Sequence, residues 1–300
     1  MNKFTMDNSD IFENVIVQYC DTETLSRLAH ISRMHYSVIR ENPIYRQFAK
    51  FYKKGDKFKT VCRKGLIHIA QWIHSTKGCK PSEFSNGIKY ACKYGYLELA
   101  QWICEVDEGR TERIGQCEFI IACKHNQLAM ANWLYKISPE YCGHDGEVFG
   151  NVCYSGYLEM AQWLYNDVQG LDYDSIGEIF QDTCHTKHLD VAKWLNETGH
   201  VDGDDRVIGL GYAVEGGYIK VVEWLLDIGV DTSDDGDNGL IITACENGHL
   251  QIAKLLQARG ADIHAQDDCI FKFRLTHPNE GCPREIDSAI LEWIDSLRGK

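Results

Sequence analysis

The chain has 300 residues, of which 44% are apolar and 25% charged, and its formal net charge is −13 at pH 7. A charge of this sign repels polyphosphate, so we expect no nucleic acid as the main ligand. The longest apolar runs have four or five residues, far below the roughly 18 that a membrane-spanning helix needs, and the first residues contain no apolar stretch of signal-peptide length. We therefore expect an intracellular protein without membrane contact, in the cytoplasm or alternatively in the nucleus.

Residues 1–57 are predicted to form a separate helical module. Asp10, with Glu13 three residues later, is typical of the capping box that opens a helix, and an apolar segment follows it. A second helix is predicted after Asp21, because apolar residues recur there at helical spacing. Its apolar positions are Leu25, Leu28, Ile31, Val38 and Ile39.

This segment resembles an F-box. The pattern of an apolar first helix, a short turn and a second helix is matched at Leu25, Leu28, Ile31, Ser32, Arg33 and Tyr36, whereas Ser9-Asp10 replaces the Leu-Pro that opens the family's motif. The resemblance implies binding to the Skp adaptor of cullin-RING ubiquitin ligases. The implied adaptor-binding residues are Ile11, Phe12, Val15, Ile16 and Leu25. The alternative is that these helices only cap the repeats that follow.

Tryptophan marks a repeat along the rest of the chain. Trp72, Trp102, Trp133, Trp163, Trp194 and Trp224 are spaced 30, 31, 30, 31 and 30 residues apart. A constant period of this length indicates a stacked array in which each unit buries its apolar face only against its neighbours. We therefore predict an all-α solenoid of seven to eight helix-turn-helix units, in which each Trp packs beside its equivalents.

Each unit is predicted to contain two helices joined by a tight turn. A small apolar pair ends the first helix, and after two polar residues a Gly recurs at positions 65, 95, 156, 217 and 248. Gly suits the left-handed backbone that closes a helix; Asn126 at the same place is the next most tolerant residue, and Lys187 is a less favourable one. In the second helix, the spacing of Leu97, Ala100 and Ile103 predicts a buried stripe.

These units resemble ankyrin repeats. The seventh is the plainest, because Ala244-Cys245-Glu246-Asn247-Gly248-His249-Leu250 and the later Gly260-Ala261-Asp262-Ile263-His264-Ala265 match the family's signature. The Thr-Pro that opens the family's first helix is absent, and each unit is two or three residues short of the usual 33. This short, Trp-containing variety is similar to the ankyrin arrays of large DNA viruses and some protists, which would place a viral chain in the host cytoplasm.

The resulting domain prediction has three parts. Residues 1–57 form the F-box-like or capping module, residues 58–266 form seven ankyrin-like repeats, and residues 267–300 form a degenerate C-terminal capping repeat. Ile286, Ile290, Leu291, Trp293 and Ile294 lie at helical spacing in the last part. Its charged end suits a terminal unit, which must turn a polar face to water.

Cysteine and histidine recur at positions that could indicate either a reactive or metal-binding site or simple packing. Cys62, Cys92, Cys123, Cys153, Cys184 and Cys245 share one slot of the repeat, which favours small buried side chains over disulfides. Cys184, His185 and His188 have metal-ligand chemistry, but Cys184 belongs to the buried slot and His188 to a slot held elsewhere by Tyr. We therefore expect no catalytic residue, metal or cofactor.

Binding is predicted at the two polar positions that end each first helix, because in an ankyrin-like stack these side chains point toward a concave groove. The predicted partner-binding residues are Arg63, Lys93, Tyr94, Lys124, His125, Tyr154, His185, Glu215 and Glu246. Their charges change from basic to acidic along the array, which predicts a protein partner with complementary charge asymmetry. The expected function is that of a monomeric, non-enzymatic adaptor that delivers a partner to a ubiquitin ligase; the alternative is a stand-alone scaffold or decoy.

Overall fold

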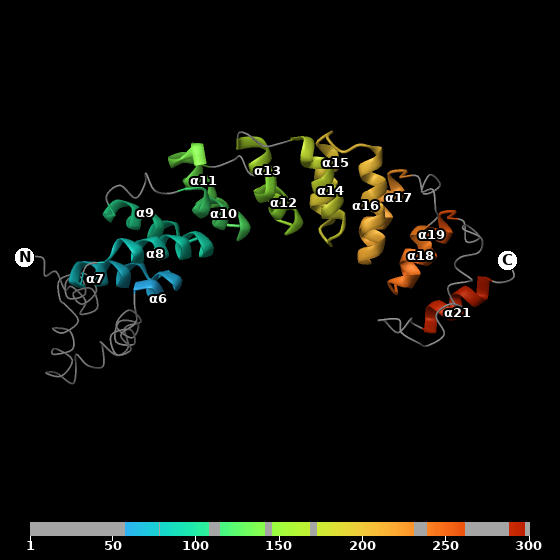
Figure 1. The fold of residues 1–300 in the computed structure, drawn as a ribbon, viewed down its shortest axis with the longest axis horizontal. Helices are drawn as coiled ribbons and strands as arrows, with labels where there is room; N and C mark the ends of the chain where they lie inside the picture. Colours follow the sequence, from blue (N-terminus) through green and yellow to red (C-terminus); the bar gives the residue numbers. More distant parts are fainter. Residues whose placement is uncertain are drawn as a thin grey trace, which may run out of the picture. The chain divides into compact units, whose positions relative to one another are not determined.

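The computed structural model describes residues 58–77, 79–107, 115–141, 146–168, 173–230, 239–261 and 288–297. Within these ranges the chain forms α-helices and two short 3-10 turns, with no strand, which confirms the all-α prediction (Figure 1). The chain divides into two compact parts, an N-terminal block that ends at Pro139 and a C-terminal block that begins at Glu140. The predicted F-box-like helices and the predicted adaptor-binding residues lie outside the described residues.

Three helix-turn-helix repeats are described in the N-terminal block. Their first and second helices are α6 (Phe58–Arg63) with α7 (Ile67–Lys77), α8 (Pro81–Tyr94) with α9 (Leu97–Val106), and α10 (Gln116–Lys124) with α11 (Leu128–Ile137). Each first helix contacts the first helix of the next repeat, so that α8 lies between α6 and α10. This side-by-side order is the stack that the period predicted.

Four more repeats are described in the C-terminal block. They are α12 (Gly146–Tyr154) with α13 (Leu158–Asp167), α14 (Ile176–Cys184) with α15 (Leu189–Glu197), α16 (Gly203–Gly216) with α17 (Ile219–Asp227), and α18 (Gly239–Glu246) with α19 (Leu250–Ala258). The 3-10 turns η3 (Pro139–Tyr141) and η4 (Tyr173–Ser175) precede α12 and α14. Here too the first helices pack in chain order, α12 on α14, α14 on α16 and α16 on α18.

A last helix, α21 (Ser288–Leu297), confirms the helix predicted from apolar spacing near the C-terminus. Ile290, Trp293, Ile294 and Leu297 are buried, whereas Glu292 and Ser296 are exposed. One side of this helix therefore faces protein and the other faces water, as a terminal unit requires.

The buried stripe of the second helices differs from the prediction by its first residue. In α9, Leu97 is only half-buried, while Leu99, Ala100 and Ile103 are buried. Leu97 is the first residue of the helix, so its side chain lies at the edge of the packed face. The same pattern of an aliphatic residue or Met, a small residue and Leu is buried as Met130-Ala131-Leu134, Met160-Ala161-Leu164, Val191-Ala192-Leu195, Val221-Val222-Leu225 and Ile252-Ala253-Leu256.

The indole rings pack against phenylalanines of the preceding repeat. Ring centroids of Phe58 and Trp102 are 6.3 Å apart, and the corresponding distances are 6.2 Å for Phe149 with Trp194 and 6.3 Å for Phe180 with Trp224. In these three cases a half-buried indole covers a buried Phe at the junction between two repeats.

The turn between the two helices confirms the role predicted for Gly. Gly65, Gly95, Gly156, Gly217 and Gly248 all have a positive φ, between 68° and 83°, and Asn126 has φ 56°. A second constraint acts at Gly217, because a Cβ there would lie 2.5 Å from the ring of His249 in the next repeat. Tyr96 lies over Gly65, Gln127 over Gly95 and His188 over Gly156 in the same way.

Lys187 does not adopt the left-handed backbone of the equivalent glycines. The turn is closed instead by Thr186, whose hydroxyl donates to the carbonyl oxygen of Thr183 at 2.6 Å and accepts from the N–H of His188 at 3.2 Å. Thr186 is consequently 7% exposed. Thr186 occupies the second of the two polar positions that are predicted to face the groove, and at this residue the prediction is wrong because the side chain closes the turn.

Candidate binding surfaces

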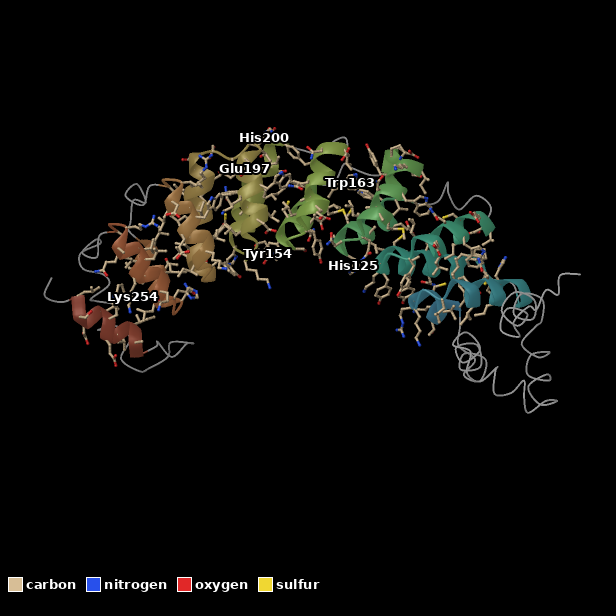
Figure 2. All side chains as sticks on the ribbon, turned by 180° about the vertical axis from the view of Figure 1, so that it is seen from behind. His125, Tyr154, Trp163, Glu197, His200 and Lys254 are labelled. Carbon is tan, nitrogen blue, oxygen red and sulfur yellow. The ribbon has the colours of Figure 1, made fainter. Side chains whose placement is uncertain are left out.

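The predicted partner-binding residues reach solvent at the C-terminal ends of the first helices. Lys93 is partly exposed, and Arg63, Tyr94, Lys124, His125, Tyr154, His185, Glu215 and Glu246 are exposed. Five of them belong to the N-terminal block and four to the C-terminal block. Figure 2 labels one from each block, His125 beside the end of α10 and Tyr154 at the end of α12.

In the N-terminal block, lysines and tyrosines lie against one another on α6 and α8. The rings of Tyr90 and Tyr94 stack with a centroid distance of 6.4 Å and an interplanar angle of 6°. Lys59 Nζ lies 5.8 Å from the centroid of the Tyr90 ring, and Lys93 Nζ lies 5.6 Å from that of Tyr94. We call this surface, with Arg63, Lys124 and His125, the N-terminal face. Lys59 and Tyr90 belong to the same surface as the predicted residues but were not predicted.

Positive charge on the N-terminal face affects His125. Partial burial is the main cause that lowers the pKa of His125 below its ordinary value, and the nearby Lys93 ammonium lowers it further. The lowered pKa favours the neutral form of His125, so that the positive charge of the face comes mainly from Lys and Arg.

The acidic residues of these helices have structural roles at the opposite end. The N–H of Lys80 donates to Glu83 Oε2 at 2.9 Å, and the N–H of Gly115 donates to Glu118 Oε2 at 3.3 Å. Both glutamates thus satisfy backbone groups where α8 and α10 begin. In α8 and α10 the acid lies in the first turn and a lysine lies in the last turn, which leaves the C-terminal ends of these two helices basic.

The C-terminal block presents aromatic and acidic side chains instead. The His185 ring lies 5.8 Å from the Tyr212 ring and 6.4 Å from the Tyr218 ring, both in the next repeat. Tyr154 is 52% exposed, and Glu215 and Glu246 are also exposed. We call these six residues the C-terminal face. The two tyrosines beside His185 were not predicted, although Tyr212 occupies the same place in its repeat as Tyr90.

Two of the candidate metal ligands, Cys184 and His188, take part in packing. Cys184 is buried, and burial raises the pKa of its thiol to about 12, whereas His188 lies over Gly156 of the preceding repeat. The same slot is buried at Cys62, Cys92, Cys123, Cys153 and Cys245, which confirms its predicted packing role. Among residues that the structure describes, no group of three His, Cys, Asp or Glu is placed to hold a metal ion.

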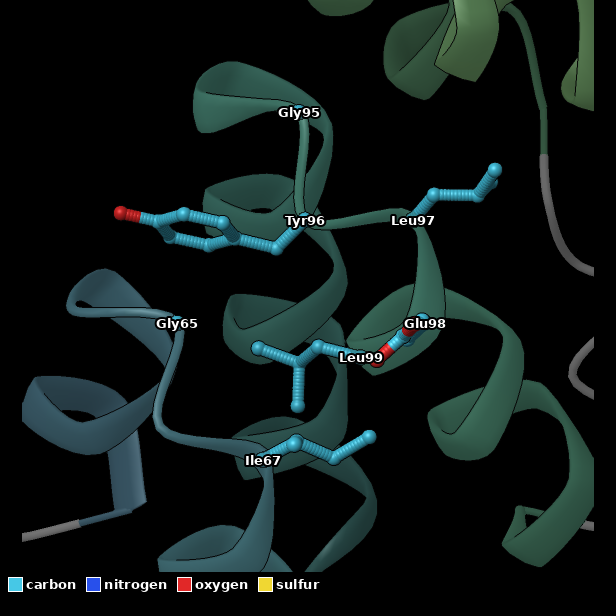
Figure 3. A pocket seen from close by; sticks show the side chains of 7 residues that line it. All are labelled: Gly65, Ile67, Gly95, Tyr96, Leu97, Glu98 and Leu99. Atoms are coloured by element: carbon cyan, nitrogen blue, oxygen red, sulfur yellow. The ribbon is translucent and has the colours of Figure 1, made fainter.

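A small open hollow of about 380 Å³ lies between the turns of the first two repeats (Figure 3). Its lining consists of Gly65, Ile67, Gly95, Tyr96, Leu97, Glu98 and Leu99. Tyr96 and Glu98 are the only two polar side chains among these residues. The turn glycines of these two repeats, Gly65 and Gly95, have no side chains to fill this space. Tyr96 packs over Gly65 and forms one wall of the hollow.

Comparison with known families supports the ankyrin resemblance. A model of ankyrin repeats in three copies matches residues 149–267, and a search of curated proteins finds no match. The matched range covers most of the repeats of the C-terminal block. The described helices thus form an all-α stack of helix-turn-helix repeats, and the matched part consists of ankyrin repeats, which generally act as protein–protein interaction modules. No helix in the described ranges has the length and apolar character needed to cross a membrane.

Proposed function

We propose that this protein is a non-enzymatic interaction protein that binds a partner protein through the N-terminal and C-terminal faces. The observation that carries the proposal is the side chain that ends each first helix. Arg63, Lys93 and Lys124 stand in the last turns of their helices, where a positive charge stabilises the helix dipole. Glu215 and Glu246 occupy the same slot in α16 and α18, where a negative charge is unfavourable.

The stability of the helices therefore does not explain which residue types occupy this position in all of the repeats. A selection for helix stability alone would place Lys or Arg in every repeat. The slot instead holds, in chain order, three bases that are exposed or partly exposed, an exposed Tyr, an exposed His and two exposed acids. Recognition of a partner with a defined charge pattern accounts for this variation, because complementary potentials orient the encounter and exclude wrong partners.

Charge reversal on the N-terminal face tests the proposal. We expect Lys93→Glu with Lys124→Glu to weaken the partner's binding about tenfold or more, because each reversed charge replaces an attraction by a repulsion. The measurement is the affinity for the partner purified with the chain from native cells. The control reverses Lys136 and Lys254, which are exposed on the second helices α11 and α19; Figure 2 labels Lys254. Equal losses in the two double variants would refute the proposed surface.

We further propose that residues 1–57 link the repeats to a ubiquitin ligase through an F-box-like module. The support is the match of the apolar sequence pattern, with Ile11, Phe12, Val15, Ile16 and Leu25 as the adaptor-binding residues. The bound partner would then be presented for ubiquitin transfer. The alternative is a stand-alone scaffold or decoy in which the same helices cap the first repeat.

A binding assay with the purified Skp adaptor separates these two functions. The F-box-like function predicts that the full chain binds the adaptor and that deletion of residues 1–45 abolishes binding. The point variant Leu25→Asp should also abolish it while the far-ultraviolet circular dichroism of the repeats stays unchanged. If the full chain does not bind the adaptor, the scaffold or decoy function is favoured.

A further inference from the structure

We propose that the N-terminal face binds an extended peptide segment rich in aspartate and glutamate, with Lys59 and Lys93 as its principal contacts. This inference rests on the proposed function and specifies the partner's chemistry for one of the two faces. Three features of the face support the inference. They are the local excess of positive charge, the pre-ordered lysine side chains, and the contacts that the two tyrosine rings make with each other and with the lysines.

The charge excess is local to the first helices of the N-terminal block. Helices α6, α8 and α10 contain Lys59, Arg63, Lys89, Lys93 and Lys124, against the two glutamates that cap α8 and α10. The complete chain has a net charge of −13, so this face is an exception within an acidic protein. An acidic segment is repelled by the net negative charge of the chain and attracted by this local positive charge, which favours this site.

The stacked tyrosines order the lysines before binding. Lys59 and Lys93 each lie over one ring of the Tyr90–Tyr94 pair, so their long side chains have less conformational freedom to lose when a carboxylate binds. Tyr94 is also 41% exposed, and it can contact the peptide's backbone at a low entropic cost.

The same ring arrangement favours a peptide over single-stranded nucleic acid. Nucleic-acid surfaces of this kind offer open aromatic faces on which bases stack. Here Tyr90 and Tyr94 stack on each other at an interplanar angle of 6°, and each also lies under a lysine. The negative charge of the rest of the chain opposes a polyphosphate strand more strongly than a peptide of lower charge density.

The test uses the full chain and fluorescein-labelled poly-L-glutamate, with fluorescence anisotropy as the readout. We expect binding that weakens as salt is raised, and about a tenfold loss of affinity in the double variant Lys59→Gln, Lys93→Gln. The matched control is Lys136→Gln, Lys254→Gln, which removes the same charge from the second helices and should leave the affinity unchanged within about twofold.

Three results would overturn the inference: no binding of poly-L-glutamate, equal losses in the two double variants, or tighter binding of a single-stranded oligothymidylate of equal charge at the same salt. The proposed function is tested separately by the native partner and the charge reversal at Lys93 and Lys124. If that reversal weakens the native partner while poly-L-glutamate fails to bind, only the acidic-peptide inference is lost.

Discussion

Replacement of Phe180 by alanine should lower the free energy of unfolding by about 3–5 kcal/mol. Phe180 is fully buried in α14 and faces Trp224 of the next repeat. Its ring also lies against the backbone of α16, since a Cβ added to Gly209 would lie 3.1 Å from Phe180 Cε1. The alanine variant would leave a cavity at the junction of two repeats, and a repeat array has no other core that could compensate.

The control for this prediction is present in the sequence itself. Leu210 and Ile241 are buried in the slot that Phe180 occupies, so the fold accepts a branched aliphatic residue there. We expect Phe180→Leu to cost only about 1–1.5 kcal/mol. Urea unfolding followed by circular dichroism measures both variants. If the alanine variant is no less stable than the leucine variant, Phe180 does not hold the junction together.

Gly217→Ala should lower the free energy of unfolding by about 2–3 kcal/mol, from two separate causes. Alanine in a left-handed backbone costs about 1–2 kcal/mol, and Gly217 has φ 77°. The added methyl group would also displace the ring of His249, whose Nε2–H donates to the carbonyl oxygen of Glu215 at 3.0 Å. Loss of that hydrogen bond adds about 1 kcal/mol.

Gly248 separates the two causes. It has φ 83°, and no atom of the described residues lies within 4 Å of the place where its Cβ would stand. Gly248→Ala should therefore show the backbone cost alone, about 1 kcal/mol less than Gly217→Ala. In a His249→Ala background the difference between the two glycine variants should disappear, as a double-mutant cycle would measure. A difference that persists without His249 would assign the excess to another contact.

Much of the fold could be predicted because the repeat makes local signals recur. One Gly after two polar residues is a weak sign of a turn, but five of them at a constant period, with Asn126 in a sixth copy, indicate a left-handed backbone that the structure confirms. The lower suitability of Lys187 for this backbone was also visible, and the structure shows that Thr186 closes the turn instead. The hydroxyl of Thr186 was not identified as the closing group because other copies have Tyr, His or Ser there.

Contacts between repeats were the part that could not be predicted. The recurrence of Phe58, Phe149 and Phe180 is visible in the sequence, but their pairing with tryptophans about 45 residues later depends on how one repeat is rotated against the next. The same rotation places Tyr212 beside His185 and Lys59 beside Tyr90. A period fixes which positions are equivalent but not which positions of neighbouring copies meet, so two residues of each candidate surface were missed.

The side chains that lie over Gly65, Gly95, Gly156 and Gly217 come from the following repeat, as with Tyr96 over Gly65 and His249 over Gly217. Each of these junctions therefore has a direction, because the glycine belongs to the repeat on the N-terminal side and the covering side chain belongs to the repeat on the C-terminal side. Removal of a repeat from the C-terminal side would uncover the glycine before it and expose that turn to water. Removal of a repeat from the N-terminal side would instead leave the covering side chain of the next repeat without the glycine against which it packs. Serial truncations from the two ends should thus lose stability in unequal steps, and fraying should have a preferred direction.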